Sequence, residues 1–119
     1  MRKSILALAL LGACAVPASA QSIGGQYTTQ GTNLDGSPYS GTADITLTSE
    51  TTCEIKWATG STEASGICMR NDDAFSAAYV LNGEIGLVIY KAGADGTLSG
   101  LWTVAGKEGS GTEVLTPIE

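Results

Sequence analysis

The chain of 119 residues contains no histidine. Histidine is the commonest general base in enzymes and a frequent metal ligand, so its absence removes Ser-His-Asp and Cys-His catalytic arrangements and most zinc sites. A serine nucleophile served by lysine and a carboxylate pair for glycoside hydrolysis both stay formally open. No pair of residues stands out for either reaction. We therefore predict a protein that is not an enzyme and that uses no metal and no cofactor.

Basic residues are also scarce. The chain has 6 Lys and Arg against 12 Asp and Glu, and two of its few basic residues, Arg2 and Lys3, stand at the very start. This excess of acidic residues favours solubility and disfavours nucleic acid or an anionic membrane as partner.

Long apolar runs are missing except near the N-terminus. Residues 4–16 are apolar and follow Arg2 and Lys3, and the segment PASA at 17–20 supplies small residues for cleavage. The run is shorter than the roughly 20 residues of a membrane span. We predict a signal peptide over residues 1–20 and one mature domain over residues 21–119, which is secreted or periplasmic.

A second cleavage is the alternative. The segment LGAC ending at Cys14 loosely matches a bacterial lipobox. Cleavage there would place a lipid on Cys14 and anchor the domain to a membrane as a lipoprotein.

Cysteine is rare, and only Cys53 and Cys68 follow the predicted signal peptide. A lone pair in a small exported domain predicts a disulfide. If the strand-like segments 51–58 and 65–70 pair about Gly60-Ser61, Cys53 lies opposite Cys68, as a cross-strand bridge requires. We expect the polar segment 59–64 to be the loop between these strands.

The predicted mature chain shows no helical periodicity. Short segments rich in β-branched and aromatic residues alternate with turn signals, of which Asn82-Gly83 is the strongest. Strands are expected at 24–30, 39–48, 51–58, 65–70, three across 74–105, and 112–118. Eight sequential antiparallel strands close naturally and thereby remove exposed edges. The predicted fold is an all-β, eight-stranded antiparallel up-and-down barrel, and an open sandwich is the alternative.

The aromatic residues are spread over most of the predicted strands. In a small barrel such side chains fill the core, but at an open mouth they form a pocket that stacks against a ligand. Our candidate ligand-binding residues are Trp57, Tyr90 and Trp102. Glu113 is the most notable acidic residue, and it is either buried near the rim and paired with Arg70 or directed outward.

Motifs of glycine and aromatic residues recur along the predicted mature chain: Gly25-x-Tyr27, Gly31-Thr32-Asn33-x-Asp35-Gly36-x-x-Tyr39-x-Gly41, Trp57, Gly66-Ile67-Cys68, Gly86-Leu87-x-Ile89-Tyr90, Asp95-Gly96-x-Leu98-x-Gly100-x-Trp102-Thr103 and Gly111-Thr112-Glu113-x-Leu115. Together they resemble short secreted alphaproteobacterial proteins that are commonly labelled fibronectin-binding proteins. Residues 92–100 are also similar to a hairpin of streptavidin, and this resemblance implies a small barrel of the calycin or avidin type.

The first resemblance implies a secreted, non-enzymatic binding protein whose partner is a host extracellular-matrix protein such as fibronectin. Two alternatives stay open. One is a carrier of a small apolar molecule, with its pocket inside the barrel. The other is a periplasmic inhibitor of a lysozyme-type enzyme, which would act through loop 59–64 or loop 106–111.

Overall fold

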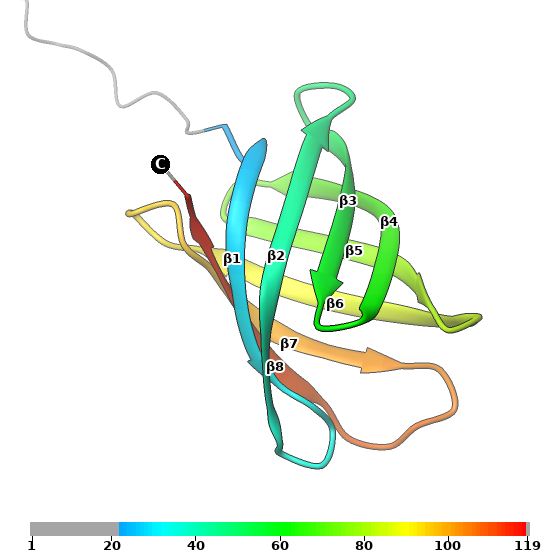
Figure 1. Ribbon diagram of the computed structural model, residues 1–119. Helices are drawn as coiled ribbons and strands as arrows, with labels where there is room; N and C mark the ends of the chain where they lie inside the picture. Colours follow the sequence, from blue (N-terminus) through cyan, green and yellow to red (C-terminus); the bar gives the residue numbers. More distant parts are fainter. Residues whose placement is uncertain (1–21, 119) are drawn as a thin grey trace, which may run out of the picture.

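The computed structural model describes residues 22–118, which form a closed barrel of eight antiparallel strands in sequence order (Figure 1). The strands are β1 (Gly25–Thr32), β2 (Pro38–Leu47), β3 (Thr52–Thr59), β4 (Thr62–Asn71), β5 (Ala74–Leu81), β6 (Glu84–Ala92), β7 (Leu98–Val104) and β8 (Gly111–Pro117). The predicted eight-stranded antiparallel barrel is confirmed. The predicted signal peptide and the alternative lipidation site at Cys14 lie outside the described residues.

The described part of the chain holds no helix of the length and apolarity that a membrane crossing would need.

Because the strands alternate in direction, the turns gather at two ends of the barrel (Figure 1). The Asn82 end carries the turns at 33–37, 60–61, 82–83 and 105–110. The Cys53 end carries the turns at 48–51, 72–73 and 93–97 together with residues 22–24.

Side chains alternate between the interior and the exterior along each strand. On β3, Cys53, Ile55 and Trp57 are buried, as their spacing predicts. Phe75 and Tyr90 stack in the middle of the barrel with ring centroids 5.5 Å apart. These side chains and their neighbours make up a single apolar core.

The apolar run on β6 divides between the two faces of the sheet. Its inward positions hold a glycine, a valine and a tyrosine. Ile85, Leu87 and Ile89 face outward and are 62%, 56% and 67% exposed, respectively. Outward-facing apolar side chains continue on the neighbouring strands β5 and β7, at Val80 and Leu101, and on β4 beyond β5, at Ile67 and Met69. Cross-strand pairs connect part of this set, because Ile85 lies opposite Val80 and Ile89 lies opposite Leu101. Exposed apolar surfaces of this kind are typical of contacts with other molecules.

The hairpin turn at Asn82-Gly83 has the backbone that its sequence predicts. Asn82 has φ 53° and Gly83 has φ 80°, which places both residues in the left-handed region. A type I′ turn requires this conformation at both positions.

Replacing Gly83 by valine should lower the free energy of unfolding by about 1–2 kcal/mol, since a β-branched residue resists positive φ. Urea denaturation of the two proteins measures the loss. Glu84→Val is the matched control, because Glu84 is an exposed strand residue at which valine fits the backbone. Equal stability of Gly83→Val and the parent protein would refute this role of the turn.

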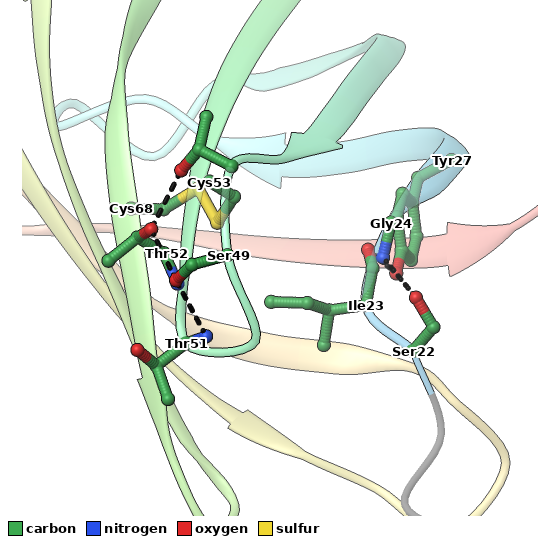
Figure 2. The surroundings of a disulfide bond; sticks show 10 residues. Ser22, Ile23, Gly24, Tyr27, Ser49, Thr51, Thr52, Cys53 and Cys68 are labelled. Atoms are coloured by element: carbon green, nitrogen blue, oxygen red, sulfur yellow. Dashed lines mark hydrogen bonds between the residues drawn. A yellow bond between two sulfur atoms is a disulfide. The ribbon is translucent and has the colours of Figure 1, made fainter.

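The disulfide joins neighbouring strands near the Cys53 end (Figure 2). Cys53 lies directly opposite Cys68 in the ladder, and their Cα atoms are 5.0 Å apart. The predicted bridge and its register are therefore both confirmed. A disulfide is consistent with a location outside the cytoplasm.

The expected loop at 59–64 is much shorter than predicted. β3 runs through Thr59 and β4 begins at Thr62, so only Gly60 and Ser61 make the turn. The polar side chains of Thr62 and Glu63 suggested a loop, but these residues form the first positions of β4.

Candidate functional site

A cavity of about 340 Å³ opens at the Asn82 end of the barrel. Its walls combine four aromatic side chains with small polar and aliphatic ones. They are Asn33, Tyr39, Trp57, Thr59, Thr62, Ala64, Tyr79, Leu81, Asn82, Val88, Trp102 and Glu113. Cavities of this size, mostly apolar with a few polar groups, are typical of small-molecule sites.

Glu113 of β8 is the acidic group of this cavity, and its side chain is only 6% exposed. Its Oε1 accepts a hydrogen bond from the Tyr39 hydroxyl at 2.5 Å. Its Oε2 accepts one from Trp57 Nε1 at 2.8 Å and another from the Tyr90 hydroxyl. Three strands, β2, β3 and β6, thus direct donors at one carboxylate.

The predicted pairing of Glu113 with Arg70 is wrong, and so is the alternative of an outward-facing Glu113. Arg70 lines a different cavity, at the Cys53 end, where its Nε donates to the Asp72 carbonyl oxygen at 2.9 Å. Alternation on β8 places Glu113 inside, two residues before the fully buried Leu115.

The tyrosines around Glu113 are held in their neutral form. Burial raises the pKa of Tyr39, Tyr79 and Tyr90, and the negative charge of Glu113 raises each of them further. Neutral phenols can donate a hydrogen bond to the carboxylate, which phenolates cannot do. Burial also raises the pKa of Tyr27 in the core, against a smaller opposing effect of Arg70.

These shifts predict an alkaline transition. The chain has 4 tyrosines and all of them have a raised pKa in the folded state. A raised folded-state pKa contributes stability below the unfolded pKa of about 10, and this stability is lost as the pH rises above it. In an alkaline titration we expect phenolate absorbance to appear only together with the loss of the β-sheet circular dichroism signal.

The same titration in denaturant is the control, and there all four tyrosines should ionise near pH 10. A tyrosine that ionised near pH 10 while the circular dichroism stayed native would contradict the buried, neutral phenols.

Two glycines make room for the aromatic walls. A Cβ on Gly86 would lie 2.2 Å from Tyr79 Cζ, and a Cβ on Gly111 would lie 2.5 Å from the Trp102 ring. Each glycine is the cross-strand partner of the aromatic residue that covers it. Aromatic side chains over cross-strand glycines are a known device of β-barrels.

The walls consist of two edge-to-face ring pairs. Tyr39 and Trp102 have centroids 6.1 Å apart at 72°, and Trp57 and Tyr79 have centroids 5.1 Å apart at 62°. The edge of an aromatic ring carries partial positive charge and its face carries partial negative charge, so edge-to-face pairs attract each other.

The structure brings two of the three predicted ligand-binding residues to the cavity. Trp57 and Trp102 line it, whereas Tyr90 does not and is only 1% exposed, with its hydroxyl on Glu113. Sequence reasoning missed Tyr39 and Tyr79 as wall residues. The sequence feature that could have identified both is an inward-facing aromatic residue within a few positions of a turn at the Asn82 end.

The described residues contain no cluster of three or more His, Cys, Asp or Glu that could hold a metal ion. Glu113 stands as a single carboxylate among neutral donors, which is not a coordination site.

No family model and no curated protein matches this chain. Among solved structures, it is similar to designed β-barrels. A redesigned β-barrel aligns with a TM-score of 0.69 and 16% identity over 82% of this chain and 92% of that one. A de novo designed fluorescence-activating β-barrel aligns with a TM-score of 0.63 and 14% identity over 80% of this chain and 93% of that one. The redesigned β-barrel mFAP1, bound to DFHBI, aligns with a TM-score of 0.66 and 16% identity over 79% of this chain and 94% of that one. At this identity the likeness establishes the fold, a closed barrel compatible with a binding protein or a ligand carrier.

Proposed function

We propose that this protein is a non-enzymatic carrier that binds one small organic molecule in the cavity at the Asn82 end. The observation that carries the proposal is the cavity itself, with aromatic walls and one hydrogen-bonded carboxylate. An eight-stranded barrel is wide enough either to be filled by side chains or to hold one small ligand. In this barrel the core fills the middle, and the Asn82 end is left open.

The designed barrel mFAP1 supports the proposal in one respect. That protein binds DFHBI in its own structure, and it shares the barrel architecture at 16% identity. A barrel of this architecture is therefore able to hold a small molecule. No binding residue transfers from it to this chain.

Fibronectin binding stays a prediction from the sequence, and so does enzyme inhibition. The inhibitor hypothesis now has one long turn available, at 105–110, because the turn after Thr59 contains only Gly60 and Ser61. The cavity favours the carrier over both.

The test uses the tryptophans as reporters. The chain contains 2 tryptophans, and both Trp57 and Trp102 line the cavity. Protein exported by a bacterial host and purified without denaturant should carry a small molecule in native mass spectrometry, or should change its tryptophan emission on titration with members of a library of small aromatic compounds.

Ala64→Phe places a ring inside the cavity and should abolish this response. Ala58→Phe is the matched control, because Ala58 is an exposed, outward-facing residue of the adjacent strand, opposite Glu63. Equal binding by the two variants, or the absence of any saturable ligand, would overturn the carrier function.

A further inference from the structure

The cavity at the Asn82 end contains a negative charge that its walls do not neutralise. The three hydrogen-bond donors on Glu113 are two phenols and an indole, all uncharged. None of the twelve residues that line the cavity is a lysine or an arginine. Three donated hydrogen bonds match an ionised carboxylate, which only accepts. A buried anion of this kind favours a cation beside it.

Glu113 also keeps an acceptor position for a ligand. A carboxylate offers about four lone-pair positions, two on each oxygen. Oε2 accepts two hydrogen bonds, from Trp57 and Tyr90, whereas Oε1 accepts one, from Tyr39. One position on Oε1 is therefore open on a residue that lines the cavity.

The polar atoms of the aromatic walls are already engaged with the protein. Trp102 Nε1 donates to the Thr112 carbonyl oxygen at 3.2 Å, and the Tyr79 hydroxyl donates to the Thr103 carbonyl oxygen at 3.1 Å. The donors of Tyr39 and Trp57 are directed at Glu113. The four aromatic residues therefore offer ring surfaces, and none offers a free N–H or O–H to an anion.

Ring faces and a carboxylate select the same kind of ligand. The face of an aromatic ring carries partial negative charge and attracts a cation within about 6 Å of its centroid. The edge-to-face pairs Tyr39–Trp102 and Trp57–Tyr79 direct rings of different orientation at the cavity. The neutral Asn33 and Asn82 at its mouth do not oppose this polarity.

We propose that the ligand is a small organic ammonium cation, whose charged nitrogen lies between the aromatic walls and donates to Glu113 Oε1. A cavity of about 340 Å³ has room for roughly ten water-sized groups, which sets the size of the molecule. A compact aromatic amine or a branched alkyl amine, protonated at neutral pH, has both the required size and the required charge. This inference rests on the proposed carrier function and specifies its ligand class.

The test compares three probes of nearly the same shape and different charge: benzylammonium, benzyl alcohol and benzoate. Tryptophan fluorescence and isothermal titration calorimetry measure their affinities at neutral pH. We expect benzylammonium to bind at least about tenfold more tightly than benzyl alcohol, and benzoate to bind more weakly than either. Benzyltrimethylammonium, which cannot donate, should bind more weakly than benzylammonium.

Two variants connect this preference to the residues. Glu113→Gln removes the charge and should bring the affinities for benzylammonium and benzyl alcohol close together. Thr62→Lys places an ammonium group of the protein at the cavity and leaves the partners of Glu113 intact, so it should abolish benzylammonium binding even if Glu113→Gln does not fold. Ala58→Lys is its control, with the same change in net charge on the outside of the barrel.

The outcomes separate the two proposals. If benzyl alcohol or benzoate binds as tightly as benzylammonium, or if Thr62→Lys binds benzylammonium as Ala58→Lys does, the cation inference is overturned and the carrier function stands. If no probe and no member of the library occupies the cavity, the carrier function itself fails.

Discussion

Replacing Glu113 by alanine should lower the free energy of unfolding by about 3 kcal/mol. The substitution leaves three donors without an acceptor: the hydroxyls of Tyr39 and Tyr90 and the indole N–H of Trp57. A buried donor that loses its partner costs about 1–3 kcal/mol. Because the cavity is open at the Asn82 end, water can reach part of this site, so we take the lower end of the range for each donor. Urea denaturation measures the difference.

One opposing effect has to be weighed against this loss. Glu113 is a buried charge, and removing a buried charge relieves the cost of its desolvation. Breaking one side of a buried polar network is nevertheless destabilising, since the remaining partners stay buried. Tyr90 lies deepest and cannot turn to solvent, because only 1% of it is exposed.

Glu63→Ala is the control for the Glu113 substitution. Glu63 is an exposed glutamate on β4, so its loss should change stability by less than about 0.5 kcal/mol. If Glu113→Ala proved as stable as Glu63→Ala, the three hydrogen bonds would not hold the cavity walls, and the site would need another explanation.

Much of this fold could be predicted from local signals. Asn82-Gly83 specifies its own turn through positive φ, whatever the rest of the chain does. The position of Cys53 opposite Cys68 follows from the single turn at Gly60-Ser61 between them. Such features depend on a few neighbouring residues, and for that reason sequence reasoning finds them.

The faces of β6 could not be predicted in the same way. Residues 85–90 are apolar at almost every position, so no alternation distinguishes the interior from the exterior. Packing decides instead: Gly86 faces inward because the Tyr79 ring occupies the space where a side chain would lie. A shift of one residue in the register would have exchanged every side chain between the two faces.

The carboxylate site could be predicted only in part, because barrel closure assembles it. The three partners of Glu113 lie 74, 56 and 23 positions away in the sequence. Trp57 and Trp102 were identifiable as aromatic residues on strands, but nothing in the sequence shows which rings reach the same carboxylate. Arg70 was the obvious partner by charge, and alternation and chain direction place it near the Cys53 end.

Replacing Cys53 by serine should lower the free energy of unfolding by about 3 kcal/mol, the value for a closed loop of about 15 residues in the chain-entropy model. For a domain of this size such a loss corresponds to a fall in melting temperature of roughly 15 °C. The barrel itself should persist, because the strands on both sides of the bridge remain joined by their ladder and by the two-residue turn. Differential scanning calorimetry measures the shift.

Two comparisons separate the covalent bond from the side chains. Cys53 is only 2% exposed, so a serine there also buries a hydroxyl. The double variant Cys53→Ala/Cys68→Ala lacks that hydroxyl, and it removes two buried sulfur atoms together with the bridge. Chemical reduction of the unaltered protein removes the same bond without any substitution. All three should lower the melting temperature, and the serine variant should lower it most. An unchanged melting temperature after complete reduction would mean that the ladder and core alone hold β3 and β4 together.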